Sequence, residues 1–216
     1  MKTEWGGAAG ERRAAGSETA DFSRGGNLQK HMSRNPLQRF LIWHFHRRVA
    51  QMVVATGADS ILDVGCGEGF TIDHLMSVDG QMPIQGVDYD LSALREAKRR
   101  QPEVLFQRGD MHRLPFASES FELILSLQVL EHLRHPAPAL RELRRVSSRY
   151  CLVSVPNEPL FMVANFLRGK NSRTWGNDPE HLHNWRAGQF VGMMKEHFRV
   201  KRVLYPFPWV LALCCV

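Results

Sequence analysis

Two acidic residues flank a turn rich in glycine in the stretch Asp63-Val64-Gly65-Cys66-Gly67-Glu68-Gly69. Glycine adopts positive φ without strain and lets a ligand approach the main chain, and the helix that follows such a turn points its first N–H groups into the same space. The turn is therefore predicted to cradle a ligand. Two carboxylates would repel a pyrophosphate, so the charge pattern favours a positively charged nucleoside without phosphates.

The glycine spacing excludes two phosphate-binding alternatives. A dinucleotide fingerprint has Gly-x-Gly-x-x-Gly, whereas residues 65–69 read Gly-x-Gly-x-Gly. A P-loop needs Gly-Lys-Ser or Gly-Lys-Thr, which does not follow here. The short apolar run Ile61–Val64 is typical of a buried parallel strand, and a helical pattern runs from Phe70 to Met76. The stretch is thus a predicted strand, turn and helix.

Later strands are predicted to bring more polar residues to the same cleft. A second short strand over 83–87 ends at Asp88, about twenty residues after the last glycine, where a doubly wound sheet places an acid against ribose hydroxyls. A fourth strand, 121–127, leads into Gln128-Val129-Leu130-Glu131-His132. Ligands of such sheets lie beyond the carboxyl ends of the strands, so we expect residues 126–132 to face the reacting group.

Together, these stretches resemble the motifs of the class I S-adenosylmethionine-dependent methyltransferases. S-adenosylmethionine is a nucleoside with sulfonium and ammonium charges, as the cradle requires. The resemblance implies that Tyr89 lies near the adenine, that Asp110 accepts from its exocyclic amine, and that Met111 offers an apolar face to the ring. The residues expected to bind the cofactor are Asp63, Gly65, Cys66, Gly67, Gly69, Asp88, Tyr89, Asp110, Met111, Leu127 and Gln128.

The predicted fold is a Rossmann-like, doubly wound α/β sheet of seven mostly parallel strands with flanking helices and an antiparallel strand near the C-terminus. Residues 1–34, rich in Gly, Ala, Ser and Arg, are expected to be a flexible tail. Residues 35–216 form the single domain. Within it, an amphipathic helix is predicted over 35–56 and an insertion over 157–185. The resemblance implies that the helix is a lid over the cofactor, unless it only caps the sheet, and that the insertion covers the substrate.

Composition bounds the class of protein. The chain has 216 residues, a net charge of +6 and four cysteines without metal-finger spacing. We therefore expect one domain with reduced thiols in the cytoplasm. No apolar run reaches the length of a membrane span and no signal-peptide core is visible, so no membrane partner is expected. Basic surface permits an RNA partner, but the charge is spread over helix faces that are expected to be solvated.

The predicted activity is transfer of a methyl group from S-adenosylmethionine to an oxygen or nitrogen of a small molecule. A hydroxyl acceptor needs a base, and His132 and His181 are the candidates, with His183 behind them. An RNA 2′-O-methyltransferase and a non-catalytic S-adenosylmethionine-binding protein remain as alternatives. Gln128, Glu131, His132 and His181 also resemble the metal-binding pattern of small-RNA 2′-O-methyltransferases. No metal is predicted, because Gln128 stands where that pattern has an acid.

Overall fold

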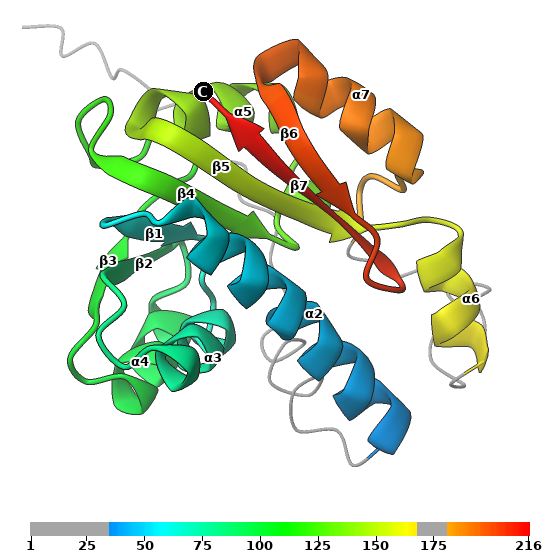
Figure 1. Ribbon diagram of the computed structural model, residues 1–216, viewed down its shortest axis with the longest axis horizontal. Helices are drawn as coiled ribbons and strands as arrows, with labels where there is room; N and C mark the ends of the chain where they lie inside the picture. The colour runs from blue at the N-terminus through cyan, green and yellow to red at the C-terminus, as the bar shows by residue number, and fades with distance from the viewer. Residues whose placement is uncertain (1–34, 168–180) are drawn as a thin grey trace, which may run out of the picture.

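A seven-stranded sheet organises the structure, a computed structural model that describes residues 35–167 and 181–216 (Figure 1). The strands are β1 (Ile61–Val64), β2 (Ile84–Asp88), β3 (Leu105–Arg108), β4 (Phe121–Leu127), β5 (Ser147–Pro156), β6 (Arg199–Leu204) and β7 (Trp209–Cys215). Their order is β3-β2-β1-β4-β5-β7-β6. The first five strands pair in parallel, and β7 runs antiparallel to both β5 and β6. The predicted fold class is confirmed.

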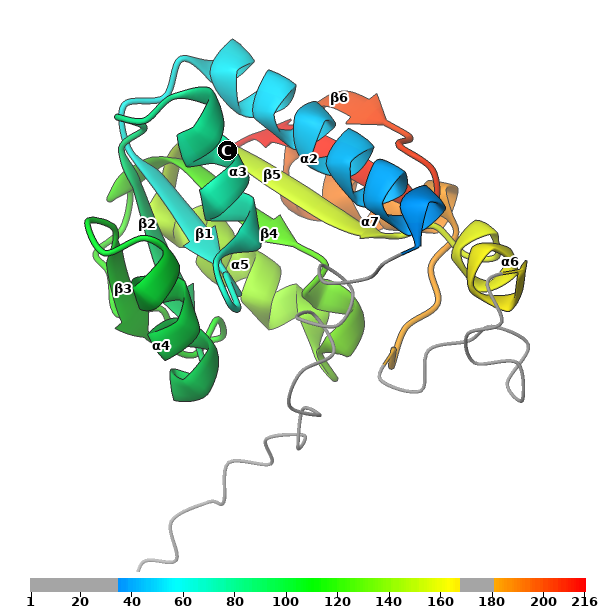
Figure 2. The same ribbon diagram turned by 90° about the horizontal axis from the view of Figure 1, so that it is seen from below.

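Helices cover both faces of the sheet (Figures 1 and 2). They are α2 (Pro36–Thr56), α3 (Phe70–Val78), α4 (Leu91–Arg100), α5 (Pro136–Val146), α6 (Leu160–Leu167) and α7 (Ala187–His197), with a 3₁₀ turn, η1 (Leu130–His132). Side chains of α2, α3 and α4 share one hydrophobic cluster with the sheet, and those of α5 and α7 share another. No helix in the described ranges is long and apolar enough to cross a membrane.

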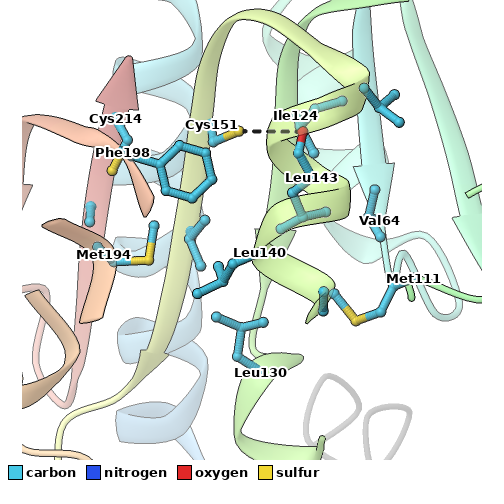
Figure 3. Close-up of a cluster of buried hydrophobic side chains, with 14 of the residues drawn as sticks. Val64, Met111, Ile124, Leu130, Leu140, Leu143, Cys151, Met194, Phe198 and Cys214 are labelled. Atoms are coloured by element: carbon cyan, nitrogen blue, oxygen red, sulfur yellow. Dashed lines mark hydrogen bonds between the residues drawn. The ribbon is translucent and has the colours of Figure 1, made fainter. Parts of the chain in front are cut away.

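The two clusters follow from the apolar patterns of the strands. All four residues of β1 are buried, as expected for a central parallel strand. Figure 3 shows the cluster beneath α5 and α7, where Leu140 and Leu143 pack beside Ile124 of β4 and Met194 of α7. The four cysteines are free thiols, in agreement with the sequence.

Helix boundaries reflect local capping. The side chain of Asn35 accepts hydrogen bonds from the first turn of α2, and the Asp90 carboxylate accepts one from Ser92 N, so each begins its helix where the sequence predicts. Strand β5 begins at Ser147, three residues earlier than expected, because it follows α5 without a loop. The predicted tail, 1–34, lies outside the described residues, as does part of the 157–185 insertion.

Candidate active site

The glycine turn is held by its own main chain and by Asp88. The Gly65 and Cys66 amides donate to Val87 O at 2.8 and 3.2 Å, and the Gly67 amide donates to Asp88 Oδ2 at 2.7 Å. Gly69 N donates to Cys66 O at 3.0 Å. These amides are therefore already satisfied inside the turn and do not form the open nest that binds phosphate. All four amides precede α3, so the expectation that the first N–H groups of this helix point toward the ligand stays a prediction.

Gly65 also allows the strand end of β4 to approach the turn. Its φ is +78°, and a Cβ placed there would lie 2.5 Å from Cγ2 of Val129. The neighbouring Gln128 has a positive φ of 60°, which is strained for a residue other than glycine. Its backbone amide donates to Ser154 O, and its side-chain amide donates to Ser154 Oγ, both at 3.0 Å. These bonds fix Gln128 over the end of the sheet.

Asp63 supplies a buried carboxylate on the floor of the site. Its side chain is 2% exposed, and Oδ2 finds no hydrogen-bond partner among the described residues. Burial first, and then the charge of Asp88, raise the pKa of Asp63 to about 7. A cationic group beside Oδ2 would relieve this cost by favouring the charged carboxylate. The site therefore fits a ligand that brings positive charge and hydrogen-bond donors.

Asp88, the last residue of β2, holds the glycine turn through hydrogen bonds. Oδ2 accepts from Gly67 N and Oδ1 accepts from Asp90 N at 2.8 Å. Burial raises the pKa of Asp88, although these amide bonds oppose the shift. A carboxylate has about four lone-pair sites, so two remain for a diol. The position fits the predicted ribose contact, which stays a prediction.

A cavity of about 120 Å³ opens beside the turn. Six of the predicted residues line it: Asp63, Gly65, Cys66, Leu127, Gln128 and His132. Burial first, and then the charge of Asp63, raise the pKa of the Cys66 thiol, so Cys66 contributes a neutral wall. The cavity is lined both by the acidic turn and by the segment after β4. The sequence predicts that the turn binds the cofactor and that the segment faces the reacting group.

The remaining predicted cofactor residues lie outside this cavity. Asp88, Tyr89 and Asp110 follow the neighbouring ends of β2 and β3, which pair in parallel. Tyr89 is half exposed with the Arg108 guanidinium 5.1 Å from its ring, and the Asp110 carboxylate accepts from His112 N at 2.9 Å. The Met111 side chain, by contrast, is buried in the hydrophobic core (Figure 3), so it supports the loop from beneath.

Gly69 serves helix packing. It precedes α3 with φ +81°, and a Cβ there would lie 3.1 Å from Cβ of Ala97 on α4. The glycine lets α3 start close against α4, which fixes the direction in which the turn leaves the sheet.

The two candidate bases meet at the far end of the cavity. The rings of His132 and His181 are 5.2 Å apart, edge to face. His132 lines the cavity, whereas the His181 side chain is buried behind it, with Nδ1 3.8 Å from the buried carboxylate of Glu158. Leu182 N donates to Glu131 O at 2.8 Å, which holds the 181–183 segment against η1.

His183 has a structural setting. Its ring stacks on Trp185 at 4.8 Å, and Nε2 is 2.9 Å from Leu133 O. The residue types that bind metals also gather here, since Glu131, His132 and His181 offer ligand atoms within 4.8 Å of one another. The predicted absence of a metal stays a prediction.

The opposite wall of the cavity comes partly from the two segments expected as a lid or cap and as a substrate cover, but its individual residues were not predicted from the sequence. It comes from the inner face of α2, from α6 and from the start of β7, with Phe45, His46, Phe161, Asn165 and Trp209 lining it. Trp209 lies 4.9 Å from the Phe45 ring and 6.5 Å from the Phe161 ring. The apolar periodicity of 36–55 predicted a buried face on α2, but neither that pattern nor the apolar residues of 160–167 showed what those faces would contact.

The fold and this cleft define a Rossmann-like α/β domain with a cofactor site at the carboxyl ends of its strands. Residues 62–150 match the family described as methyltransferase domain. A probable S-adenosylmethionine-dependent methyltransferase of Mycobacterium tuberculosis is 35% identical over 106 residues, which cover 48% of this chain and 38% of that protein. A demethylmenaquinone methyltransferase of Roseiflexus is 33% identical over 134 residues, or 55% of each chain.

Solved structures agree on the fold. Magnesium protoporphyrin IX methyltransferase of Synechocystis, solved with bound S-adenosylhomocysteine, has a TM-score of 0.65 at 15% identity and covers 87% of this chain and 91% of its own. A methyltransferase of Thermotoga maritima has a TM-score of 0.59 at 16% identity and covers 88% and 98%. Residues 62–150 therefore match a methyltransferase domain, the chain is similar to class I S-adenosylmethionine-dependent methyltransferases, and these findings support S-adenosylmethionine as the cofactor. The chain spans about two fifths to one half of the curated relatives described above.

Proposed function

We propose that this chain transfers a methyl group from S-adenosylmethionine to an oxygen or nitrogen atom of a small molecule. The observation that supports this proposal is Asp63, a buried carboxylate that lines the cavity and whose Oδ2 has no hydrogen-bond partner among the described residues. A phosphate ligand would find repulsion there, whereas an ammonium or sulfonium group finds a counter-charge. The four free thiols suit the reducing cytoplasm as the place of action.

The residues divide by position along the cleft. We assign the methionine end of the cofactor to Asp63, Gly65, Cys66, Leu127 and Gln128, which share the cavity wall. We assign the ribose hydroxyls to Asp88 and the adenine to Tyr89 and Asp110. The Gly67 and Gly69 positions shape the turn between these two groups.

The bound cofactor supplies an electrophilic methyl group on sulfur, so the protein mainly holds donor and acceptor in line. Gln128 and His132 border the part of the cavity in which an acceptor would sit. For a hydroxyl acceptor, a ring nitrogen of His132 would accept the proton that the hydroxyl loses when the methyl group passes from sulfur to oxygen and S-adenosylhomocysteine is left. His181 packs against the His132 ring and orients it. A nitrogen acceptor that is already neutral needs no such base.

The acceptor is a small molecule in this proposal because the aromatic side chains of Phe45, Phe161 and Trp209 line the cavity. The Roseiflexus relative, a demethylmenaquinone methyltransferase, supports that choice. RNA, the alternative acceptor, is usually bound by aromatic platforms beside basic residues, and no Lys or Arg is among the described residues that line this cavity.

A methyl-transfer assay tests the proposal. Purified protein is incubated with S-adenosylmethionine carrying a labelled methyl group and with either a small-metabolite extract or total RNA. The proposal expects label in the metabolite fraction and none in RNA, and it expects His132→Ala to abolish transfer to hydroxyl acceptors. Label confined to RNA would favour the 2′-O-methyltransferase reading, and cofactor binding without any labelled product would favour a non-catalytic protein.

A further inference from the structure

One end of the molecule carries exposed large apolar side chains on three elements. They are Phe40 and Trp43 of α2, Leu160, Val163 and Phe166 of α6, and Phe207 of the turn before β7, and their exposed fractions run from 41% to 56%. In Figures 1 and 2 the beginning of α2 lies near α6 and the β6–β7 turn. The inner faces of α2 and α6 line the same cavity, which confirms that these elements are neighbours.

The exposed residues form stripes rather than isolated positions. On α2 the spacing of Leu37, Phe40 and Trp43 is i, i+3, i+6, and on α6 Leu160, Val163 and Phe166 repeat it. Such spacing puts three side chains on one helix face. Helix α6 is apolar on both faces and contains no charged residue, since its other face is buried against the cavity. Exposed apolar stripes on neighbouring helices are typical of an interaction site.

The charges around the stripes have one sign. Arg39, Arg47 and Arg48 belong to α2, whereas Arg199 and Lys201 of β6 lie at the end of that strand away from residues 205–208, near Cys215 and Tyr150. No Asp or Glu occurs in α2, α6, β6 or β7 over the residues for which the structure gives these elements. The Arg47 guanidinium lies 5.3 Å from the Trp43 ring, so charge and aromatic surface alternate along α2.

We propose that α2, α6 and residues 205–208 form a surface that binds anionic phospholipid membranes peripherally. Apolar and aromatic side chains enter the boundary between headgroups and acyl chains, while neighbouring arginines attract the negative headgroups. A specific protein partner would instead be recognised through complementary charges of both signs that fix its register. No membrane partner was expected from the sequence because no span is present, but a peripheral contact requires none.

The position of the surface has a consequence for the cavity. Ile42 and Phe45 of α2 and Phe161 and Asn165 of α6 line the cavity on the inner sides of the same two helices. A chain seated on a membrane through their outer sides holds this cavity close to the bilayer. Acceptors dissolved in the membrane would then reach it without crossing water.

Vesicle co-sedimentation of the full chain tests the proposal without cofactor or acceptor, so its result is independent of the methyltransferase activity. The full chain is expected to sediment with vesicles of phosphatidylcholine and phosphatidylglycerol, to remain in solution with phosphatidylcholine alone, and to release in high salt. The double variant Phe40→Ser/Val163→Ser is expected to lose at least about tenfold in partitioning. Circular dichroism confirms that this variant is folded.

Leu105→Ser is the matched control, because Leu105 is 64% exposed on β3 at the far edge of the sheet. It should bind vesicles like the unsubstituted chain. Failure of the full chain to sediment with anionic vesicles overturns the proposal, and so does equal binding by the double variant. Light scattering that shows a dimer, converted to monomer by the double substitution, would also overturn it and assign the surface to self-association.

Discussion

Replacing Asp63 by asparagine should stabilise the cofactor-free protein while weakening cofactor binding. Burial raises the pKa of this carboxyl to about 7 in the folded chain, from an ordinary value of 3.8. The folded state therefore holds the proton more tightly than the unfolded state, so ionising Asp63 costs stability as pH rises from about 4 to about 7, and the cost is constant above that range. At pH 8 a shift of this size corresponds to about 4 kcal/mol, and at pH 5 to about 2 kcal/mol.

Asp63→Asn removes that cost without changing the shape of the side chain. In a domain of this size each kcal/mol moves the melting temperature by about 2–4 °C. The variant is therefore expected to melt up to about 8–16 °C higher than the unsubstituted chain at pH 8, with a smaller difference at pH 5. Affinity for S-adenosylmethionine should fall by about 10–100-fold, because a charge-assisted contact is lost.

Calorimetric melting from pH 5 to pH 8 measures the first effect, and titration calorimetry with S-adenosylmethionine measures the second. Asp59→Asn is the control, since Asp59 is exposed and its substitution should change neither quantity. A melting difference that does not grow with pH would refute the buried, unfavourable carboxylate. Unchanged cofactor affinity would refute the assignment of Asp63 to the positive end of the cofactor.

Three further predictions concern the turn and the catalytic end. Gly65→Ala should destabilise the fold by about 2–3 kcal/mol in urea unfolding, because its Cβ would lie 2.5 Å from Val129 at a positive φ, whereas Gly188→Ala, with nothing within 4 Å, should cost nothing. Equal effects of the two would contradict the close approach. His132→Ala should lower kcat for a hydroxyl acceptor by about 10²–10⁴ and leave cofactor affinity unchanged; a normal kcat would remove His132 as the base. Exhaustive chelation should not alter methyl transfer, because Gln128 offers only an amide where a hard cation prefers a carboxylate; loss of activity restored by a divalent ion would contradict this.

The sheet and most helices follow from local patterns in the sequence. The continuous apolar runs at 61–64 and 121–127 predict buried parallel strands, and Asp90 predicts the start of α4 through its cap. The topology also follows, because a glycine turn between the first strand and its helix belongs to a doubly wound sheet. The sequence pattern predicts a strand over 103–107, whereas β3 begins two residues later, at Leu105. The reason is that Val104 N donates to Gln101 O in a turn, which the apolar side chain of Val104 does not indicate.

Polar site residues at the carboxyl ends of strands could be predicted from the sequence. Site residues that are brought together by the packing of distant elements could not. The sequence singles out Asp63 and Gln128 because Asp63 lies near the carboxyl end of buried strand β1 and Gln128 directly follows β4. The structural role of Met111 depends on the core beneath its loop. Phe45 and Trp209 are far apart in sequence, and only the packing of α2 on the end of β7 brings them to one cavity. Such contacts between distant apolar residues have no local signal.

Titration calorimetry on the unsubstituted chain tests the central claim, that acids around a turn with satisfied amides select a cationic nucleoside. S-adenosylmethionine, S-adenosylhomocysteine and nicotinamide adenine dinucleotide are compared under the same conditions. The account predicts saturable binding of S-adenosylmethionine and S-adenosylhomocysteine and no binding of the dinucleotide. Binding of the dinucleotide, with no heat from S-adenosylmethionine or S-adenosylhomocysteine, would contradict the account.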